Sequence, residues 1–268
     1  MSRRILITGG SSGLGLSLAH ALAARGDTLA LLARDAKKLE AAAEAVRAKT
    51  PGARVFTVAC DVQDVPALET AFSRVVESMG GLDVLVNSAG VLREGYFESL
   101  DLATHREVMD INYFGTLHAI RAALPHLRRS GRGRIVNIAS IAGLSGVFGY
   151  TAYCASKHAL VGLTESLRFE LEPQGLVVQL VCPGEFDSPM VDALDRSRTP
   201  ENRAHAHTIP KVGVDVIVDT VVGGLEGEDF FLVPGTLAKL SVFALQHFPR
   251  VGRFLGDLRV RRAYVGPR

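Results

Sequence analysis

Cysteine is scarce in this chain of 268 residues, which contains only three. Cys60, Cys154 and Cys182 lie far apart and form no Cys-x-x-Cys pair, so the sequence excludes a disulfide framework and a cysteine-based zinc site. The simplest expectation is a reducing, cytoplasmic compartment.

An excess of charge of one sign is also lacking. Lys and Arg number 30 against 28 Asp and Glu, which gives a net charge of +2, and no basic block precedes residue 200. Nucleic-acid binding needs such a basic surface, so we expect no nucleic-acid partner.

Long hydrophobic runs are missing as well. The first apolar stretch, 5–7, meets Gly9 and Gly10 almost at once and is too short for a signal peptide. The uncharged stretch 135–156 contains Asn137, Ser140 and Thr151, so it predicts a buried strand and a loop rather than a membrane span. With no repeat and no Gly/Ser linker, the length suits one domain.

Short apolar runs alternate with segments of helical spacing. The runs that read as strands are 4–8, 29–33, 55–59, 84–87, 134–138, 177–182 and 230–233. The helical segments are 14–24, 36–49, 65–79, 102–129 and 152–171, with Asp35 and Asp64 as N-caps and Pro66 in a first turn. Continuous apolar strands are buried on both faces. This pattern predicts an α/β fold, a doubly wound parallel sheet of Rossmann type, forming a single domain with a C-terminal helical extension.

A glycine-rich turn follows the first strand. Thr8-Gly9-Gly10-Ser11-Ser12-Gly13-Leu14-Gly15 leads directly into a helix, where glycines let the backbone approach a pyrophosphate and the helix N-terminus supplies N–H donors. Its spacing differs from the usual G-x-G-x-x-G fingerprint, and a glycine-rich turn without a ligand is the alternative.

The end of the second strand indicates which dinucleotide is bound. The acidic residue that usually grips the ribose 2′-OH is absent, because the strand ends at Ala33 and is followed by Arg34, Lys37 and Lys38. Guanidinium and ammonium groups suit a 2′-phosphate, so we expect NADP rather than NAD. Alternatively, these cations form a solvated helix face.

Tyr153 and Lys157 stand at i and i+4 on the fifth helical segment and therefore share a face. A close cation favours the anionic form of a phenol, so the pair predicts a Tyr153 pKa below its usual value. Ser140, just past the fifth strand, is expected to meet them at the carboxyl edge of the sheet.

Together these motifs resemble the short-chain dehydrogenase/reductase family over roughly residues 3–190. The matching positions, in family order, are Thr8-Gly9-x-x-x-Gly13-x-Gly15, Asn87-Ser88-Ala89-Gly90, Asn112, Ser140, Tyr153-x-x-x-Lys157 and Pro183-Gly184. The resemblance implies hydride transfer between a nicotinamide and a carbonyl/alcohol pair.

The resemblance also assigns roles. Tyr153 would be the acid/base, Lys157 would bind the nicotinamide ribose and lower the Tyr153 pKa, Ser140 would hold the substrate oxygen, and Asn112 would support a proton-relay water. The implied cofactor-binding residues are Gly9, Ser11, Ser12, Gly13, Leu14, Gly15, Arg34, Lys38, Asp61, Val62, Asn87, Ala89, Gly90, Tyr153, Lys157, Pro183, Gly184, Phe186 and Ser188. We expect a homodimer or homotetramer.

Two positions depart from the family pattern. Ser88 replaces a frequent Asn, and Ser188 stands where Thr is usual but keeps the hydroxyl. Glu185 is less usual and either places a carboxylate at the substrate mouth or caps a helix or faces solvent.

Several stretches are similar to the reductases of 3-ketodihydrosphingosine, among them 148–153 and the Pro-Gly-Glu-Phe loop. That resemblance implies a long-chain 3-keto lipid with a cationic amine, which Glu185 or Asp187 would answer. Alternatives are a steroid or small-ketone dehydrogenase of the same family and a catalytically silent NADP-binding regulator.

The remaining segments predict a lid and a tail. We assign 1–234 to the catalytic domain, with 186–212 as a substrate lid, and 235–268 to an amphipathic basic extension. His205 and His207 lack a third ligand at suitable spacing, so no metal site is expected. Apolar residues recur at three- and four-residue steps in the extension, with a break at Pro249; they are Leu237, Leu240, Ala244, Phe248, Val251, Leu255 and Leu258. With five surrounding arginines (Arg250, Arg253, Arg259, Arg261 and Arg262), this tail either lies on an anionic inner membrane surface or packs on its own domain or a partner subunit.

Overall fold

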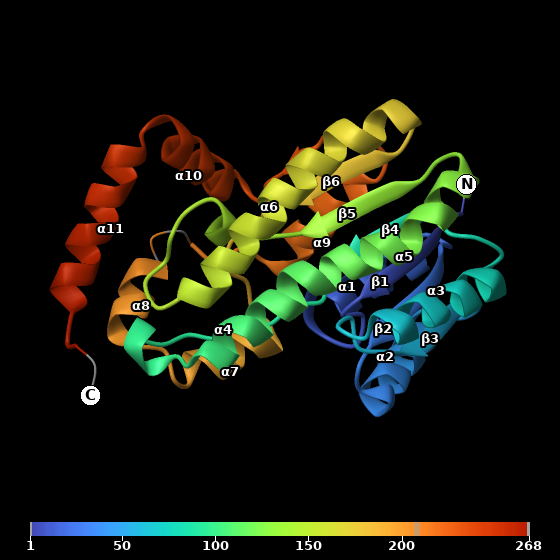
Figure 1. The fold of residues 1–268 in the computed structure, drawn as a ribbon, viewed down its shortest axis with the longest axis horizontal. Helices are drawn as coiled ribbons and strands as arrows, with labels where there is room; N and C mark the ends of the chain where they lie inside the picture. Colours follow the sequence, from blue (N-terminus) through green and yellow to red (C-terminus); the bar gives the residue numbers. More distant parts are fainter. Residues whose placement is uncertain (1, 207, 209, 267–268) are drawn as a thin grey trace.

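Seven short apolar segments form one parallel sheet in the computed structural model, which describes residues 2–206, 208 and 210–266 (Figure 1). The strands are β1 (Arg4–Thr8), β2 (Thr28–Ala33), β3 (Val55–Ala59), β4 (Val84–Asn87), β5 (Arg134–Ile138), β6 (Val177–Val181) and β7 (Phe231–Leu232). Their order is β3-β2-β1-β4-β5-β6-β7. The order reverses between β1 and β4, which is where ligands bind in this architecture.

Helices cover both faces of the sheet, because consecutive strand residues are apolar on both sides. Ile5 and Ile7 of β1 pack against α1 (Gly13–Ala24), α2 (Ala36–Lys49) and α9 (Val214–Gly224). Leu6 points the other way. That opposite face is covered by α3 (Val65–Met79), α5 (Gly115–Ser130) and α6 (Thr151–Leu171). The predicted doubly wound α/β fold is confirmed.

Helix starts follow the predicted capping chemistry. The Asp35 carboxylate accepts hydrogen bonds from the backbone N–H groups of Lys37 and Lys38, and Asp64 accepts one from Ala67. Each acid satisfies amides that have no partner inside the helix.

The predicted helix 102–129 is wrong as a single element. The segment forms α4 (Leu102–Met109), a π-helical turn η2 (Asp110–Phe114) and α5. The spacing of apolar residues cannot reveal this division, because a π turn adds only one residue to the helix and the helical spacing resumes after it. The insertion places Asn112 in the interior, where it is completely buried.

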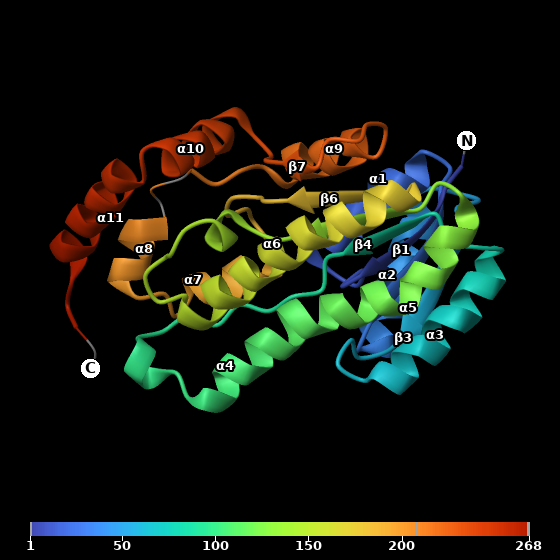
Figure 2. The ribbon, with the colours of Figure 1, turned by 45° about the horizontal axis from the view of Figure 1, so that its top comes forward.

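The segment predicted as a lid, 186–212, contains two short helices, α7 (Pro189–Asp195) and α8 (Pro200–Ala206). Beyond β7, α10 (Thr236–His247) and α11 (Pro249–Ala263) are divided at Phe248, as the break at Pro249 predicted. Figure 2 shows α11 lying alongside α8 at the end of the molecule far from the N-terminus, and the two helices are in contact. Three short helical turns complete the fold: η1 (Phe97–Ser99), η3 (Ile141–Gly143) and η4 (Glu172–Gln174). Within the described part of the chain, no helix combines the length and apolarity needed to cross a membrane.

Candidate active site

A cleft of about 460 Å³ lies along the carboxyl ends of the strands, bounded on the outer side by the lid helices. Most predicted site residues line it: Gly9, Ser11, Ser12, Gly13, Leu14, Arg34, Lys38, Asp61, Val62, Ala89, Gly90, Ser140, Tyr153, Lys157, Pro183, Gly184, Phe186 and Ser188. Gly15, Asn87 and Asn112 are not among the residues that line it.

The glycine loop forms a cradle that side chains would fill. A Cβ on Gly9 would come within 2.8 Å of the Ala89 backbone, and Gly9 has φ +69°. A Cβ on Gly15 would lie 2.4 Å from the carbonyl oxygen of Gly9, so Gly15 acts by letting α1 pack closely on the loop. The N-terminus of α1 opens onto the cleft beside this cradle, an arrangement that fits a pyrophosphate.

Two basic side chains, Arg34 and Lys38, line the same cleft as the glycine loop. The Arg34 guanidinium lies 3.6 Å from an Asp61 carboxylate oxygen and is 59% exposed, and Lys38 is 76% exposed at 3.9 Å from Asp35. Such exposed pairs are weak, so both cations remain available to an anionic group in the cleft.

Ser140, Tyr153 and Lys157 meet at the carboxyl ends of β5 and β6. The Lys157 ammonium donates a hydrogen bond to the Ile138 carbonyl at 2.9 Å and lies 5.7 Å from the centre of the Tyr153 ring. Ser140 accepts a hydrogen bond from the Ala142 amide at 3.1 Å, which fixes its hydroxyl at the start of η3. Two hydroxyls and an ammonium therefore face one point of the cleft.

The expected depression of the Tyr153 pKa is not seen. Burial raises the pKa of Tyr153 to about 12, and a hydrogen bond with Ser140 opposes this only in part. Burial also lowers the pKa of Lys157 to about 8. The sequence argument considered the cation but not the loss of water around both groups, and burial is the largest cause of both pKa shifts.

Asn112 supports the site from behind. Its amide nitrogen donates to the Val91 carbonyl and to the Ser156 hydroxyl, both at 2.9 Å, while its oxygen accepts from the Val91 amide at 2.8 Å. The side chain thus ties the loop after β4 to α6. A Cβ on Gly90 would meet the Asn112 oxygen at 3.2 Å, so this glycine lets Asn112 approach Lys157.

Asn87 belongs to a buried polar chain rather than to the cleft wall. Its amide donates to the Asn137 oxygen at 2.8 Å, and Asn137 donates in turn to the Thr164 hydroxyl on α6 at 3.0 Å. These bonds fix α6, which carries Tyr153 and Lys157, against the sheet. Sequence reasoning missed this role of Asn137 and Thr164, although an Asn inside a buried strand was the available signal.

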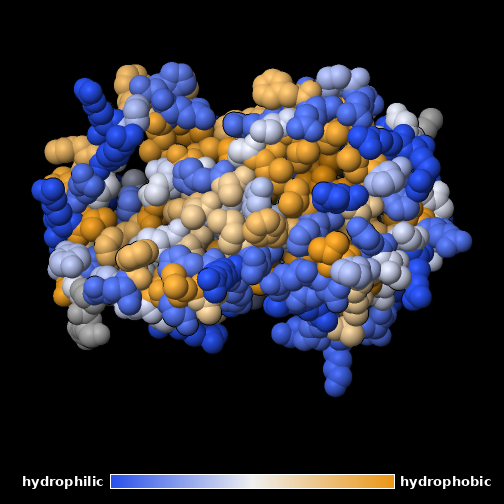
Figure 3. Space-filling view, in the orientation of Figure 1, coloured by the Kyte–Doolittle hydropathy of each residue, from blue (hydrophilic) through white to orange (hydrophobic). Residues whose placement is uncertain are grey.

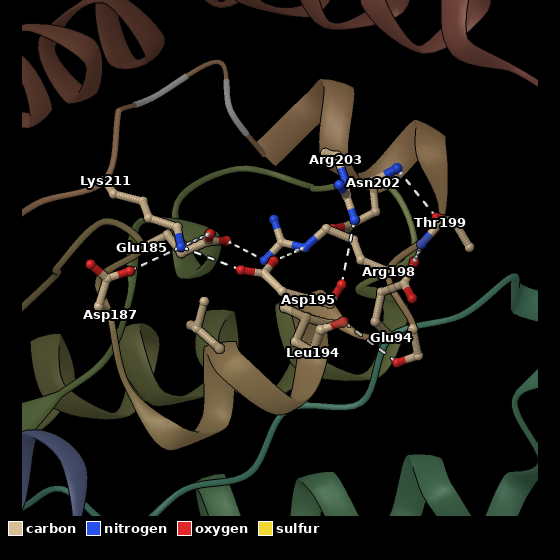
Figure 4. A network of polar contacts seen from close by, with 12 residues as sticks. Glu94, Glu185, Asp187, Leu194, Asp195, Arg198, Thr199, Asn202, Arg203 and Lys211 are labelled. Carbon is tan, nitrogen blue, oxygen red and sulfur yellow. Dashed lines mark hydrogen bonds and ion pairs between the residues drawn. The ribbon is translucent and has the colours of Figure 1, made fainter.

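The lid is held by a network of ions around Arg198, whose side chain is fully buried (Figure 4). Arg198 lies 2.8 Å from Glu185 and 3.1 Å from Asp195. Lys211 lies 3.0 Å from Asp187 and 3.4 Å from Asp195. Glu185 therefore lines the cleft but is already paired, and Asp187 is paired and 86% exposed. Exposed pairs such as Asp187 with Lys211 are weak, so the expectation that Glu185 or Asp187 answers a substrate amine stays a prediction.

The predicted histidine pair is only partly within the described residues, because His207 lies outside them. His205 accepts a hydrogen bond from the Phe148 amide at 3.1 Å through Nδ1. Across the described chain, no group of three or more His, Cys, Asp or Glu side chains is placed to hold a metal ion.

Known proteins share both this sequence pattern and this fold. The model of the short chain dehydrogenase family matches residues 3–199. The 3-ketodihydrosphingosine reductase of Bos taurus is 32% identical over 240 residues, covering 85% of this chain and 72% of that protein. An actinorhodin polyketide ketoreductase structure with NADPH is 31% identical with a TM-score of 0.78, covering 87% of this chain and 95% of the other. A short chain dehydrogenase/reductase from Burkholderia phymatum in complex with NAD is 26% identical with a TM-score of 0.82, covering 93% and 95%.

Proposed function

Because the chain belongs to the short-chain dehydrogenase family, as its motifs predicted, we propose that it reduces a ketone to a secondary alcohol with NADPH. The observation that carries this proposal is the convergence of Ser140, Tyr153 and Lys157 at one end of a cleft whose other end is a glycine cradle. A silent NADP-binding regulator would not need all three groups at one point.

The chain's own residues supply the proton and hold the substrate. When bound, the dinucleotide supplies a hydride to the carbonyl carbon. The Ser140 hydroxyl donates a hydrogen bond to the carbonyl oxygen, where negative charge develops, and the Tyr153 hydroxyl donates its proton to that oxygen. A phenol whose pKa is about 12 keeps its proton at neutral pH, so Tyr153 is in the form that can act as the acid in reduction. The Lys157 ammonium beside it stabilises the phenolate that forms.

The preference for NADPH rests on the cations at the lip of the cleft. Arg34 and Lys38 suit a 2′-phosphate, and Ala33 offers no carboxylate to repel it. Arg34 also lies within 3.6 Å of Asp61, so a bound phosphate would compete with that exposed pair. Direct titration with NADPH and NADH tests this point, and equal affinities would contradict it.

For the substrate, we propose a long-chain 3-keto lipid such as 3-ketodihydrosphingosine. Two observations support it: the similarity to 3-ketodihydrosphingosine reductases and the apolar side chains at the substrate end, among them Leu92, Val147, Met190 and Val191. A steroid or small-ketone dehydrogenase is the second candidate, since the same wall suits a rigid apolar ketone.

The C-terminal extension suggests how such a lipid is reached. Residues 236–263 contain six basic side chains and one acidic side chain, although the whole chain has a net charge of only +2. Phe254 is 66% and Leu240 64% exposed. Figure 3 shows hydrophobic and hydrophilic surface mixed at this end of the molecule. We propose peripheral contact with an anionic membrane surface, where each basic residue contributes about 1 kcal/mol. We further propose that the chain is cytoplasmic, in part at the inner membrane surface. We also propose that it forms a homodimer or homotetramer.

Two experiments test these proposals. Oxidation of NADPH is followed with ketones that differ in chain length and amine content; preference for a short ketone would favour the second candidate. Binding to anionic vesicles is measured at low and high salt, for the wild type and for Leu240→Ser with Phe254→Ser. Salt-independent binding, or binding unchanged by these substitutions, would contradict membrane contact.

A further inference from the structure

Helix α8 lies between the cleft and the C-terminal extension. At its end, Ala206 lines the cleft. On its opposite side α8 packs against α11, where a Cβ on Gly256 would lie 2.9 Å from His205 Nε2. The position of α8 therefore depends on its contacts with α11 and with the residues that follow α11.

Glu201 of α8 is the point at which three separate segments meet. The residue is completely buried, and its Oε1 accepts three hydrogen bonds. The donors are the Tyr96 hydroxyl at 2.9 Å, the Val265 amide at 2.7 Å and the Gly266 amide at 3.2 Å. Tyr96 belongs to the loop after β4, and Val265 and Gly266 follow α11. One carboxylate oxygen thus joins the lid to a cleft-side loop and to the end of the described chain.

Glu201 is held in its charged form. Burial alone would raise the pKa of Glu201, but hydrogen bonds from the backbone amides of Val265, Glu201 and Gly266 and from the Tyr96 hydroxyl outweigh burial and lower it. Hydrogen bonds to a charged acceptor are about twice as strong as neutral ones, and a buried carboxylate without donors is costly. The three donors and the carboxylate therefore hold one another in place.

We propose that Glu201 is a positioning residue that fastens the segment after α11 over α8 and so keeps the lid closed on the substrate end of the cleft. The polar contacts of Glu94 with Thr199, just before α8, and of Asn202 with Phe148 also hold this helix (Figure 4 shows Glu94, Thr199 and Asn202). This inference rests on the proposed function, because it takes the lid side of the cleft as the substrate end.

Kinetics of Glu201 variants test it. Loss of charge-assisted hydrogen bonds to a lid lowers the closed population, so Glu201→Ala should raise KM for a long-chain ketone by about tenfold or more. A short ketone that does not reach α8 should show a change of less than about twofold, and NADPH affinity should stay unchanged. Glu201→Gln keeps an accepting oxygen and should lie between the wild type and Glu201→Ala.

Two further variants separate fastening from simple loss of packing. Ending the chain after Tyr264 removes both amide donors but leaves α11, and Tyr96→Phe removes only the hydroxyl. If the three bonds act together, Glu201→Ala combined with the truncation should be no worse than Glu201→Ala alone, which already removes all three bonds. Glu226→Ala, a carboxylate paired with Arg3 and Arg25 far from the cleft, is the matched control.

Hydrogen exchange gives a readout that does not require turnover. Amides of α7 and α8 should exchange faster in Glu201→Ala and in the truncated chain, and at the wild-type rate in Glu226→Ala. Unchanged exchange and unchanged KM, or strictly additive effects in the double variant, would overturn the proposal. If Glu201→Ala does not fold, Tyr96→Phe and the truncation still decide. If the wild type reduces no ketone, the proposed function fails while exchange still tests the fastening.

Discussion

Lys157 is needed for the proposed chemistry, but burying its charge lowers the stability of the folded chain. It is 5% exposed, and burial lowers its pKa to about 8 from the ordinary 10.5. The unfolded chain therefore binds this proton more tightly than the folded chain, and the wild type gains stability as the pH rises from 8 to 10.5. A shift of this size corresponds to about 3 kcal/mol.

We predict that Lys157→Met removes both ketone reduction and this pH dependence. Methionine does not titrate, so the Lys157→Met variant does not gain the stability that the wild type gains with pH. Its free energy of unfolding, relative to that of the wild type, should therefore fall by about 2 to 3 kcal/mol as the pH rises from 7 to 10. The Ile138 carbonyl loses its donor at every pH, so this loss shifts the whole curve without changing its slope.

The assay is urea unfolding of both proteins at several pH values, without cofactor and with a reductant for the three thiols. Lys38→Met is the control, because that side chain is 76% exposed and its charge is not desolvated. A stability difference between Lys157→Met and the wild type that stays constant from pH 7 to pH 10 would refute the reasoning.

Three further outcomes follow from named contacts. Tyr153→Phe should retain NADPH binding, measured by fluorescence, while ketone reduction falls about 100- to 10,000-fold; reduction at the original rate would contradict its role as acid. Ala33→Asp with Arg34→Ala should reverse the preference for NADPH over NADH in steady-state kinetics, because a carboxylate then replaces the cation. Asp83 is 1% exposed; burial alone would raise its pKa, but hydrogen bonds from Arg4 and Arg132 lower it to about 2. Its pKa is lower in the folded chain, so Asp83→Asn should cost about 2 kcal/mol at pH 6 in urea unfolding, and that cost should shrink as the pH falls from about 4 toward 2.

Local signals in the sequence were enough to predict most of the fold. The strands 55–59, 84–87 and 134–138 have the predicted bounds, because each is a short, mainly apolar run bordered by turn residues. β7 is shorter than the predicted 230–233, since only Phe231 and Leu232 pair with β6. The π turn at 110–114 was missed, because nothing local distinguishes it from the helices on either side.

The direction of the Tyr153 pKa shift could not be predicted from the spacing of Tyr153 and Lys157 in the sequence. The i and i+4 positions correctly placed Lys157 beside Tyr153, but a pKa depends on the water that remains around a group. Ser140, on another element, affects the same phenol through its hydroxyl. Burial of that kind is decided by the lid and by the sheet together, and neither is visible in the pair of residues.

The two ends of the cleft, the proposed cofactor end and the proposed substrate end, are built by different means. The cofactor end consists of backbone geometry within one short segment, where Gly9 and Gly15 let the strand, loop and helix pack closely. The substrate end depends on contacts between distant segments, such as Glu94 with Thr199 and Glu201 with Val265. A change in one of these distant partners can reshape the substrate end without disturbing the glycine loop. Relatives that share the cofactor motif are therefore expected to differ mainly in the lid and in what packs on it.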